Sequence, residues 1–109
     1  MRDMNQQRPS DERIVVRADP DIADLIPGFL ENRRRDVDKM REALTQGEYE
    51  TIRVLGHSMK GAGGGYGFDA ITEIGAALEE AAKDNNPEKA LRGVSDLAAY
   101  LDRVEVVHD

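Results

Sequence analysis

The sequence has no cysteine, few basic residues relative to acidic ones, and no long apolar run. Without cysteine the chain has neither disulfides nor thiolate metal sites, and cysteine usage cannot indicate its redox compartment. No segment approaches the roughly 20 apolar residues of a membrane span, and the N-terminal residues do not resemble a signal peptide. We therefore expect a cytoplasmic protein that has no membrane partner.

The charge balance bears on the class of partner. The chain has 15 Lys and Arg against 22 Asp and Glu, which gives a formal net charge of −7. Nucleic-acid binding draws its affinity mainly from Lys and Arg contacts with phosphates, so we expect neither DNA nor RNA as a partner. The 109 residues suffice for one core but not for two. A charged fraction of 34% beside a hydrophobic fraction of 39% is typical of a small helical domain.

The first 18 residues differ in pattern from the rest. Residues 1–18 are interpreted as a flexible N-terminal tail, in which the β-branched residues 14–17 lie extended against the rest of the domain. Asp19 followed by Pro20 is a helix cap followed by proline at the first helical position. This pair predicts a short first helix over residues 20–26.

Apolar residues then recur at intervals of three and four along the remaining chain. The pattern predicts long amphipathic helices over residues 27–46, 48–66, 68–83 and 87–107. Four such helices joined by short turns pack most economically as an antiparallel up-down bundle. We therefore predict an all-α domain over residues 19–109, a four-helix bundle with a short extra N-terminal helix. The bundle accounts for every apolar stripe, so we expect a monomer.

A glycine cluster interrupts the third of these helices. Six of the ten glycines fall between Gly56 and Gly67, although each glycine inside a helix costs about 0.5–1 kcal/mol relative to alanine. On a helix over residues 48–66 the apolar stripe lies on one face. The opposite face carries Arg53, His57, Lys60, Gly61 and Gly64.

This bare face has a chemical interpretation. Glycines at one-turn spacing let another protein's surface approach the ring of His57, and Lys60 can neutralise an incoming anion. A neutral imidazole keeps a lone pair on one ring nitrogen and is therefore nucleophilic. The constellation favours reversible phosphorylation of the imidazole. The plain alternative is an exposed histidine without any specific role.

Two other kinds of site fit the sequence less well. A dinucleotide site needs a third glycine where Tyr66 stands, and neither a following GKS or GKT nor the alternating strands of a parallel sheet are present. A histidine metal site would have to use His108, the only other histidine, and nothing resembles an HExxH pair. We expect no bound metal.

The segment HSMKGAGGGYGF resembles the signature of histidine-containing phosphotransfer (HPt) domains. The residues that carry the resemblance are His57, Lys60, Gly61, Ala62, Gly67 and Phe68. HPt domains are helical bundles that carry a phosphoryl group between receiver-domain aspartates in two-component phosphorelays. Residues 27–107 agree with the family's four-helix bundle in length and helix order. Met59 stands where the family more often has leucine, and residues 63–65 contain more glycine than is usual there.

The resemblance assigns roles to individual residues. His57 would be phosphorylated through Nε2, and Lys60 would stabilise the phosphoryl group electrostatically. Leu78 and Glu79 are similar to a leucine and a glutamate in the phosphorylatable domain of chemotaxis histidine kinases, which implies that Glu79 orients the imidazole by accepting a hydrogen bond from Nδ1. An error of one residue in helix phase would put Glu80 there instead. The small Gly61 would let the partner dock.

The same resemblance implies the partners. These are response-regulator receiver domains, with a hybrid histidine kinase as a further candidate, and the receiver supplies both the aspartate and its Mg²⁺. We expect no cofactor on this chain, no ATP site and no autophosphorylation. The chain would be a stand-alone phosphocarrier rather than an enzyme. The alternative is a four-helix-bundle adaptor that binds receiver-like partners through the same face without phosphotransfer.

Overall fold

The computed structural model describes residues 12–108, which are mostly helical. The α-helices are α1 (Ile26–Gln46), α2 (Tyr49–Ala62), α3 (Asp69–Lys83) and α4 (Pro87–Arg103). The shorter elements are the strands β1 (Ile14–Ala18) and β2 (Val104–His108) and the 3-10 helices Ala23–Leu25 and Gly64–Tyr66. The prediction of a predominantly helical domain with four long helices is confirmed.

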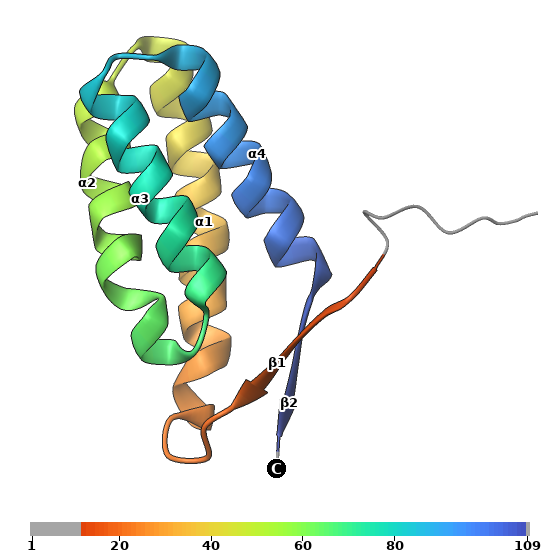
Figure 1. Cartoon of the computed structure of the whole chain (residues 1–109). Helices are drawn as coiled ribbons and strands as arrows, with labels where there is room; N and C mark the ends of the chain where they lie inside the picture. The colour runs from red at the N-terminus through yellow and green to blue at the C-terminus, as the bar shows by residue number, and fades with distance from the viewer. Residues whose placement is uncertain (1–11, 109) are drawn as a thin grey trace, which may run out of the picture.

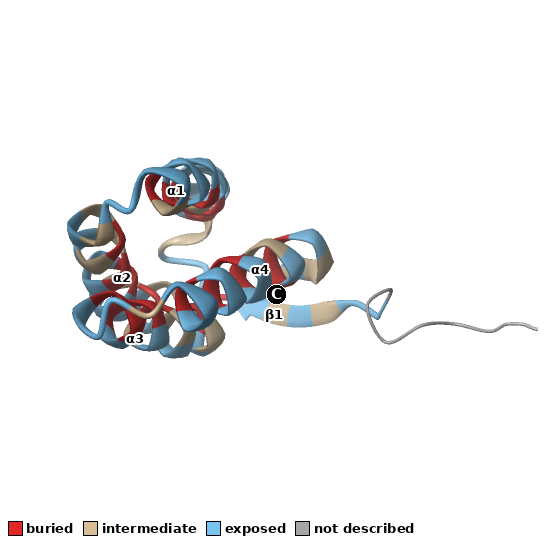
Figure 2. Cartoon of the chain, turned by 90° about the horizontal axis from the view of Figure 1, so that it is seen from above, coloured by how far each residue is buried: buried red, intermediate tan, exposed pale blue. Residues whose placement is uncertain are grey.

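The four helices pack side by side around one core. In Figure 1 the chain alternates in direction from each helix to the next, and the view from above shows the buried residues on the inner faces of the helices (Figure 2). The largest fully buried side chains are Phe68, Ile26, Met40, Ile52, Met59, Ile71, Leu78, Leu97 and Val94. Each of the four α-helices contributes side chains to this set. Because both α2 and α3 bury side chains in the same core, the core holds these two helices in a fixed relative position.

Local sequence signals explain where two of the helices begin and end. Gly47 ends α1 with a left-handed φ of 69°, a conformation that glycine adopts without steric cost. The side chain of Asn86 accepts a hydrogen bond from the backbone N–H of Lys89 at 3.1 Å and so caps α4, whose first residue is Pro87.

The C-terminal part of the prediction is wrong. The helix expected over residues 87–107 ends at Arg103, and β2 follows it and pairs in parallel with β1, in the register Ile14 with Val104. β-Branched residues dominate both strands, and such residues favour strand over helix when a partner strand is available. The domain is therefore not purely α-helical as predicted, because it also contains this small two-stranded sheet. Figure 1 shows the sheet beside the helices.

The N-terminal expectations also change. Ile14–Ala18 is a paired strand although it lies within the predicted flexible tail, and residues 1–11 lie outside the described part of the chain. The short helix expected over residues 20–26 is reduced to the 3-10 turn Ala23–Leu25, which leads directly into α1. Asp19 does accept a hydrogen bond there, from the backbone N–H of Asp21.

The helix predicted over residues 48–66 ends earlier, at Ala62. The chain then makes the 3-10 turn Gly64–Tyr66 and reverses at Gly67, which has a left-handed φ of 91°. Gly63 is needed for close packing, because a Cβ there would lie 2.7 Å from both the backbone nitrogen and the hydroxyl of Thr72. The glycine run thus forms a tight connection between α2 and α3 and does not continue the helix.

Candidate functional site

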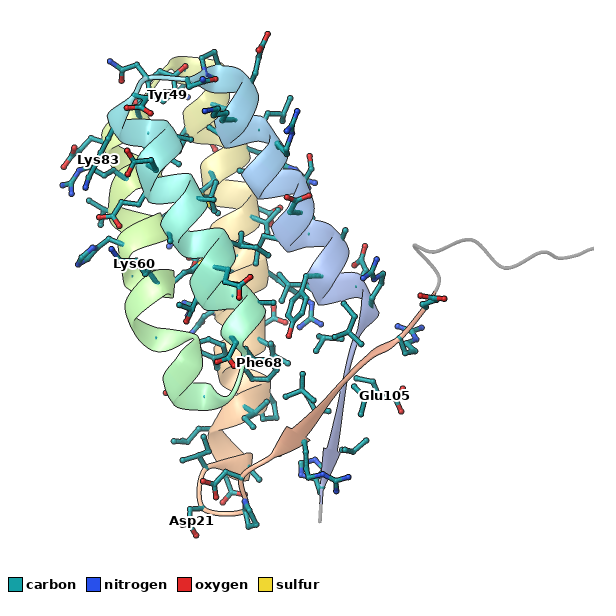
Figure 3. The ribbon with its side chains drawn as sticks, viewed as in Figure 1. Asp21, Tyr49, Lys60, Phe68, Lys83 and Glu105 are labelled. Atoms are coloured by element: carbon teal, nitrogen blue, oxygen red, sulfur yellow. The ribbon has the colours of Figure 1, made fainter. Side chains whose placement is uncertain are left out.

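His57 and Lys60 lie on α2, facing α3. The His57 side chain is 65% exposed, and a Cβ added at the nearby Gly61 would meet nothing within 4 Å. Figure 3 labels Lys60 and, further along the same side of the molecule, Lys83 of α3. The space next to Gly61 is therefore open, and its use for docking a partner stays a prediction.

Glu79 of α3 joins these side chains. Its Oε2 lies 2.9 Å from His57 Nδ1, and its Oε1 lies 2.8 Å from Lys60 Nζ. Lys83, one turn further along α3, places its Nζ 3.9 Å from Oε2. Glu79 is 6% exposed, whereas Glu80 points to solvent, so it is Glu79 that contacts the imidazole.

The electrostatics of Glu79 determine which ring nitrogen of His57 is free. The hydrogen bond from Lys60, more than the one from His57, lowers the pKa of the Glu79 carboxyl to about 2, despite the opposing effect of desolvation. An ionised carboxylate only accepts hydrogen bonds, so His57 Nδ1 must carry a proton and donate it. In the neutral ring the lone pair then resides on Nε2, which leaves Nε2 as the nucleophilic atom.

We expect the contribution of Glu79 to stability to depend on pH. Its folded-state pKa of about 2 lies below the ordinary value of 4.5, so the contribution is complete above about pH 4.5 and is lost as the pH falls through 2. Chemical denaturation of the wild type and of Glu79→Gln should show a difference in unfolding free energy that shrinks between about pH 5 and pH 2. A difference that stayed constant or grew over this range would contradict the ion-pair assignment.

Arg53 and Gly64 are placed differently from Gly61. Arg53 lies one turn before His57 but pairs with Glu50 through two hydrogen bonds, and this contact raises the pKa of its guanidinium. Gly64 follows the end of α2, and its backbone N–H donates to the Thr72 hydroxyl at 2.8 Å. The predicted helix that put Gly64 on the face of His57 was too long, because α2 ends at Ala62.

Two side chains near the site were not anticipated from the sequence. Lys83 stands four residues after Glu79, a spacing that indicates an ion pair on one helix face and could have revealed it. Val54, three residues before His57, is 50% exposed. An apolar residue outside the apolar stripe of α2 was the available signal.

Membrane-spanning helices and clusters of metal-ligating side chains are both absent from residues 12–108. No helix there is long and apolar enough to cross a membrane. Over the same residues, no group of three or more His, Cys, Asp or Glu side chains is arranged to hold a metal ion.

Comparison with known proteins adds one finding. A protein-family model described as "Hpt domain" matches residues 24–106, which is most of the chain and includes all four α-helices and the first three residues of β2. No curated protein sequence and no solved structure gave a significant match.

Proposed function

Because the chain belongs to the Hpt domain family, whose members carry phosphoryl groups on histidine in phosphorelays, we propose that His57 is the phosphorylated residue. His57 accepts a phosphoryl group on Nε2 from a receiver-domain aspartate or a kinase, and passes it to another receiver aspartate. The observation that carries this proposal is the 2.9 Å contact between His57 Nδ1 and Glu79, which leaves Nε2 unprotonated in a largely exposed ring.

The transfer step follows from this arrangement. The Nε2 lone pair attacks phosphorus in line, the bond between phosphorus and the aspartyl oxygen breaks, and its electron pair returns to the aspartate as carboxylate. Nδ1 keeps its proton, so the ring becomes positively charged as the N–P bond forms. The ionised Glu79 carboxylate stabilises that charge. The reverse attack by a second aspartate restores the neutral ring.

Lys60 supports the same step through its positive charge. Its side chain is 43% exposed, so its ammonium group can reach a phosphoryl group on the neighbouring imidazole while its present partner is Glu79 Oε1. An ammonium group in this position offsets the negative charge of the phosphoryl oxygens. The aspartate and the Mg²⁺ belong to the receiver in this scheme, and the chain brings no cofactor of its own.

The docking surface is the exposed side of α2 around His57. It consists of Val54, Gly61 and the ring of His57, with Arg53 at its edge. The exposed valine supplies apolar contact area and the glycine allows close approach. We place the protein in the cytoplasm as a monomer, with receiver domains and a hybrid histidine kinase as its partners.

Incubation with a receiver carrying a labelled aspartyl phosphate tests the proposal. We expect the label to move to this chain and to be acid-labile and base-stable, as expected for a phosphorus–nitrogen bond on histidine. An adaptor that only binds receivers through the same surface would form a complex without taking up label. Absence of label with every receiver of the same organism would refute the phosphocarrier role.

Lys60→Ala is expected to slow phosphotransfer about tenfold, which corresponds to about 1.4 kcal/mol in the transition state. The helix content should stay unchanged, because the lysine side chain is partly exposed and packs in no core. Rapid-quench transfer kinetics and circular dichroism measure the two effects. Lys89→Ala on the exposed side of α4 is the matched control and should transfer at the wild-type rate. A large loss of helicity in Lys60→Ala would contradict the placement of this side chain.

A further inference from the structure

Two buried glycines lie where α2 and α3 cross. A Cβ at Gly56 would lie 2.8 Å from both the backbone nitrogen of Glu79 and the carbonyl oxygen of Gly75. A Cβ at Gly75 would lie 2.6 Å from the backbone nitrogen of Lys60 and 2.7 Å from the carbonyl oxygen of Gly56. The atoms in the way belong to the backbone, so they cannot move aside as a side chain could. The two helices therefore approach each other more closely than any residue with a Cβ would allow.

The close approach occurs directly beneath the proposed phosphorylation site. Gly56 precedes His57 in the chain, and Gly75 lies one turn before Glu79 on α3. The backbone nitrogens that an added Cβ would meet are those of Glu79, for Gly56, and of Lys60, for Gly75. The spacing of α2 and α3 at this crossing therefore determines the gap that the side chains of His57 and Lys60 must bridge to reach Glu79.

We propose that Gly56 and Gly75 are positioning residues: their missing side chains set the spacing of α2 and α3 at which Glu79 holds the Nδ1 proton of His57. This inference rests on the proposed phosphotransfer function for its kinetic consequence. Its geometric consequence, the His57–Glu79 hydrogen bond, can be measured without any phosphotransfer.

The required displacement is large relative to a hydrogen bond. Ordinary van der Waals contacts of a Cβ begin at 3.4 Å, whereas a Cβ at Gly75 would lie 2.6 Å from the Lys60 nitrogen, so a methyl group there must separate the backbones by about 0.8 Å. The same displacement would carry the 2.9 Å contact of His57 Nδ1 with Glu79 beyond hydrogen-bonding distance. The imidazole would then be free to adopt the tautomer protonated on Nε2, which has no lone pair at the reacting nitrogen.

The matched control is a third buried glycine at another helix contact. Gly93 lies on α4 against the other side of α3, where the three atoms nearest to an added Cβ all belong to the side chain of Leu78, the closest at 2.6 Å. Gly93→Ala introduces the same methyl group into the same core without separating α2 from α3. It reports the effect of crowding the core alone.

The experiment compares Gly75→Ala with Gly93→Ala in the full chain. Ring ¹⁵N chemical shifts of His57 report the tautomer, and a ¹³C titration of the Glu79 carboxyl reports its pKa. In Gly75→Ala we expect the Nε2-protonated tautomer to appear, the Glu79 pKa to rise from about 2 toward 4.5, and transfer from a phosphorylated receiver to fall about 100-fold. Gly93→Ala should keep the wild-type tautomer and the lowered Glu79 pKa.

Each result decides the inference. A Gly75→Ala protein with the wild-type tautomer and Glu79 pKa would overturn it, even if transfer were slow. If Gly75→Ala does not fold, the same spectra are recorded on Gly56→Ala, whose closest backbone contact of 2.8 Å is less severe, in sucrose to favour the folded state. Loss of the wild-type tautomer with transfer at the wild-type rate would support the geometric role of the glycines and refute its kinetic consequence. Absence of transfer in the wild type as well would refute the proposed function and leave the geometric role standing.

Discussion

His57→Gln is expected to accept no phosphoryl group from any receiver while keeping its fold. Glutamine has an amide nitrogen without an available lone pair, so no nucleophile remains at this position. The His57 side chain is 65% exposed and contributes nothing to the core, and Glu79 keeps its ion pair with Lys60 in the variant. Surface substitutions of this kind usually change stability by less than about 0.5 kcal/mol.

The measurement is label transfer from a phosphorylated receiver, with circular dichroism to verify the fold. The second histidine provides a matched control, because His108 is exposed at the end of β2 and the same substitution there should leave transfer unchanged. Label that persisted on His57→Gln would place the acceptor elsewhere. Label that disappeared in His108→Gln as well would indicate general damage to the protein.

The helical core and the exposed face of α2 that carries His57 could be predicted from the sequence, because both follow from helical periodicity. The spacing of apolar residues placed His57, Lys60 and Gly61 on one exposed face, and that part of the helix is regular. The predicted role of Glu79 depended on family resemblance, since its side chain is buried and periodicity alone could not distinguish it from Glu80.

The parts that could not be predicted depend on contacts between distant segments. Val104–His108 continues the apolar periodicity of α4, and only its pairing with Ile14–Ala18 makes it a strand. A parallel pair of strands at opposite ends of the chain gives no local signal of its register. Gly56 and Gly75 are similar, because a glycine at a helix crossing is recognisable only once the opposite backbone is in place.

Gly61→Leu is expected to reduce phosphotransfer below detection, and to do so without destabilising the domain. An added Cβ at Gly61 meets nothing within 4 Å in the chain itself, so we expect a leucine there to project into the space that a docking receiver would occupy. Bulk at the centre of a closely packed interface prevents the reacting atoms from reaching contact distance. Replacement of a helical glycine by leucine should even stabilise α2 by several tenths of a kcal/mol.

Gly28→Leu separates this effect from a general effect of adding leucine to an exposed helix. Gly28 lies on α1, is exposed, and likewise has nothing within 4 Å of an added Cβ. We expect both variants to unfold at or above the wild-type denaturant midpoint, and only Gly61→Leu to lose transfer and receiver binding in titration calorimetry. Unaltered transfer in Gly61→Leu would refute the docking surface on α2, while leaving His57 as the candidate acceptor. Equal losses in both variants would mean that the receiver also covers the N-terminal turn of α1.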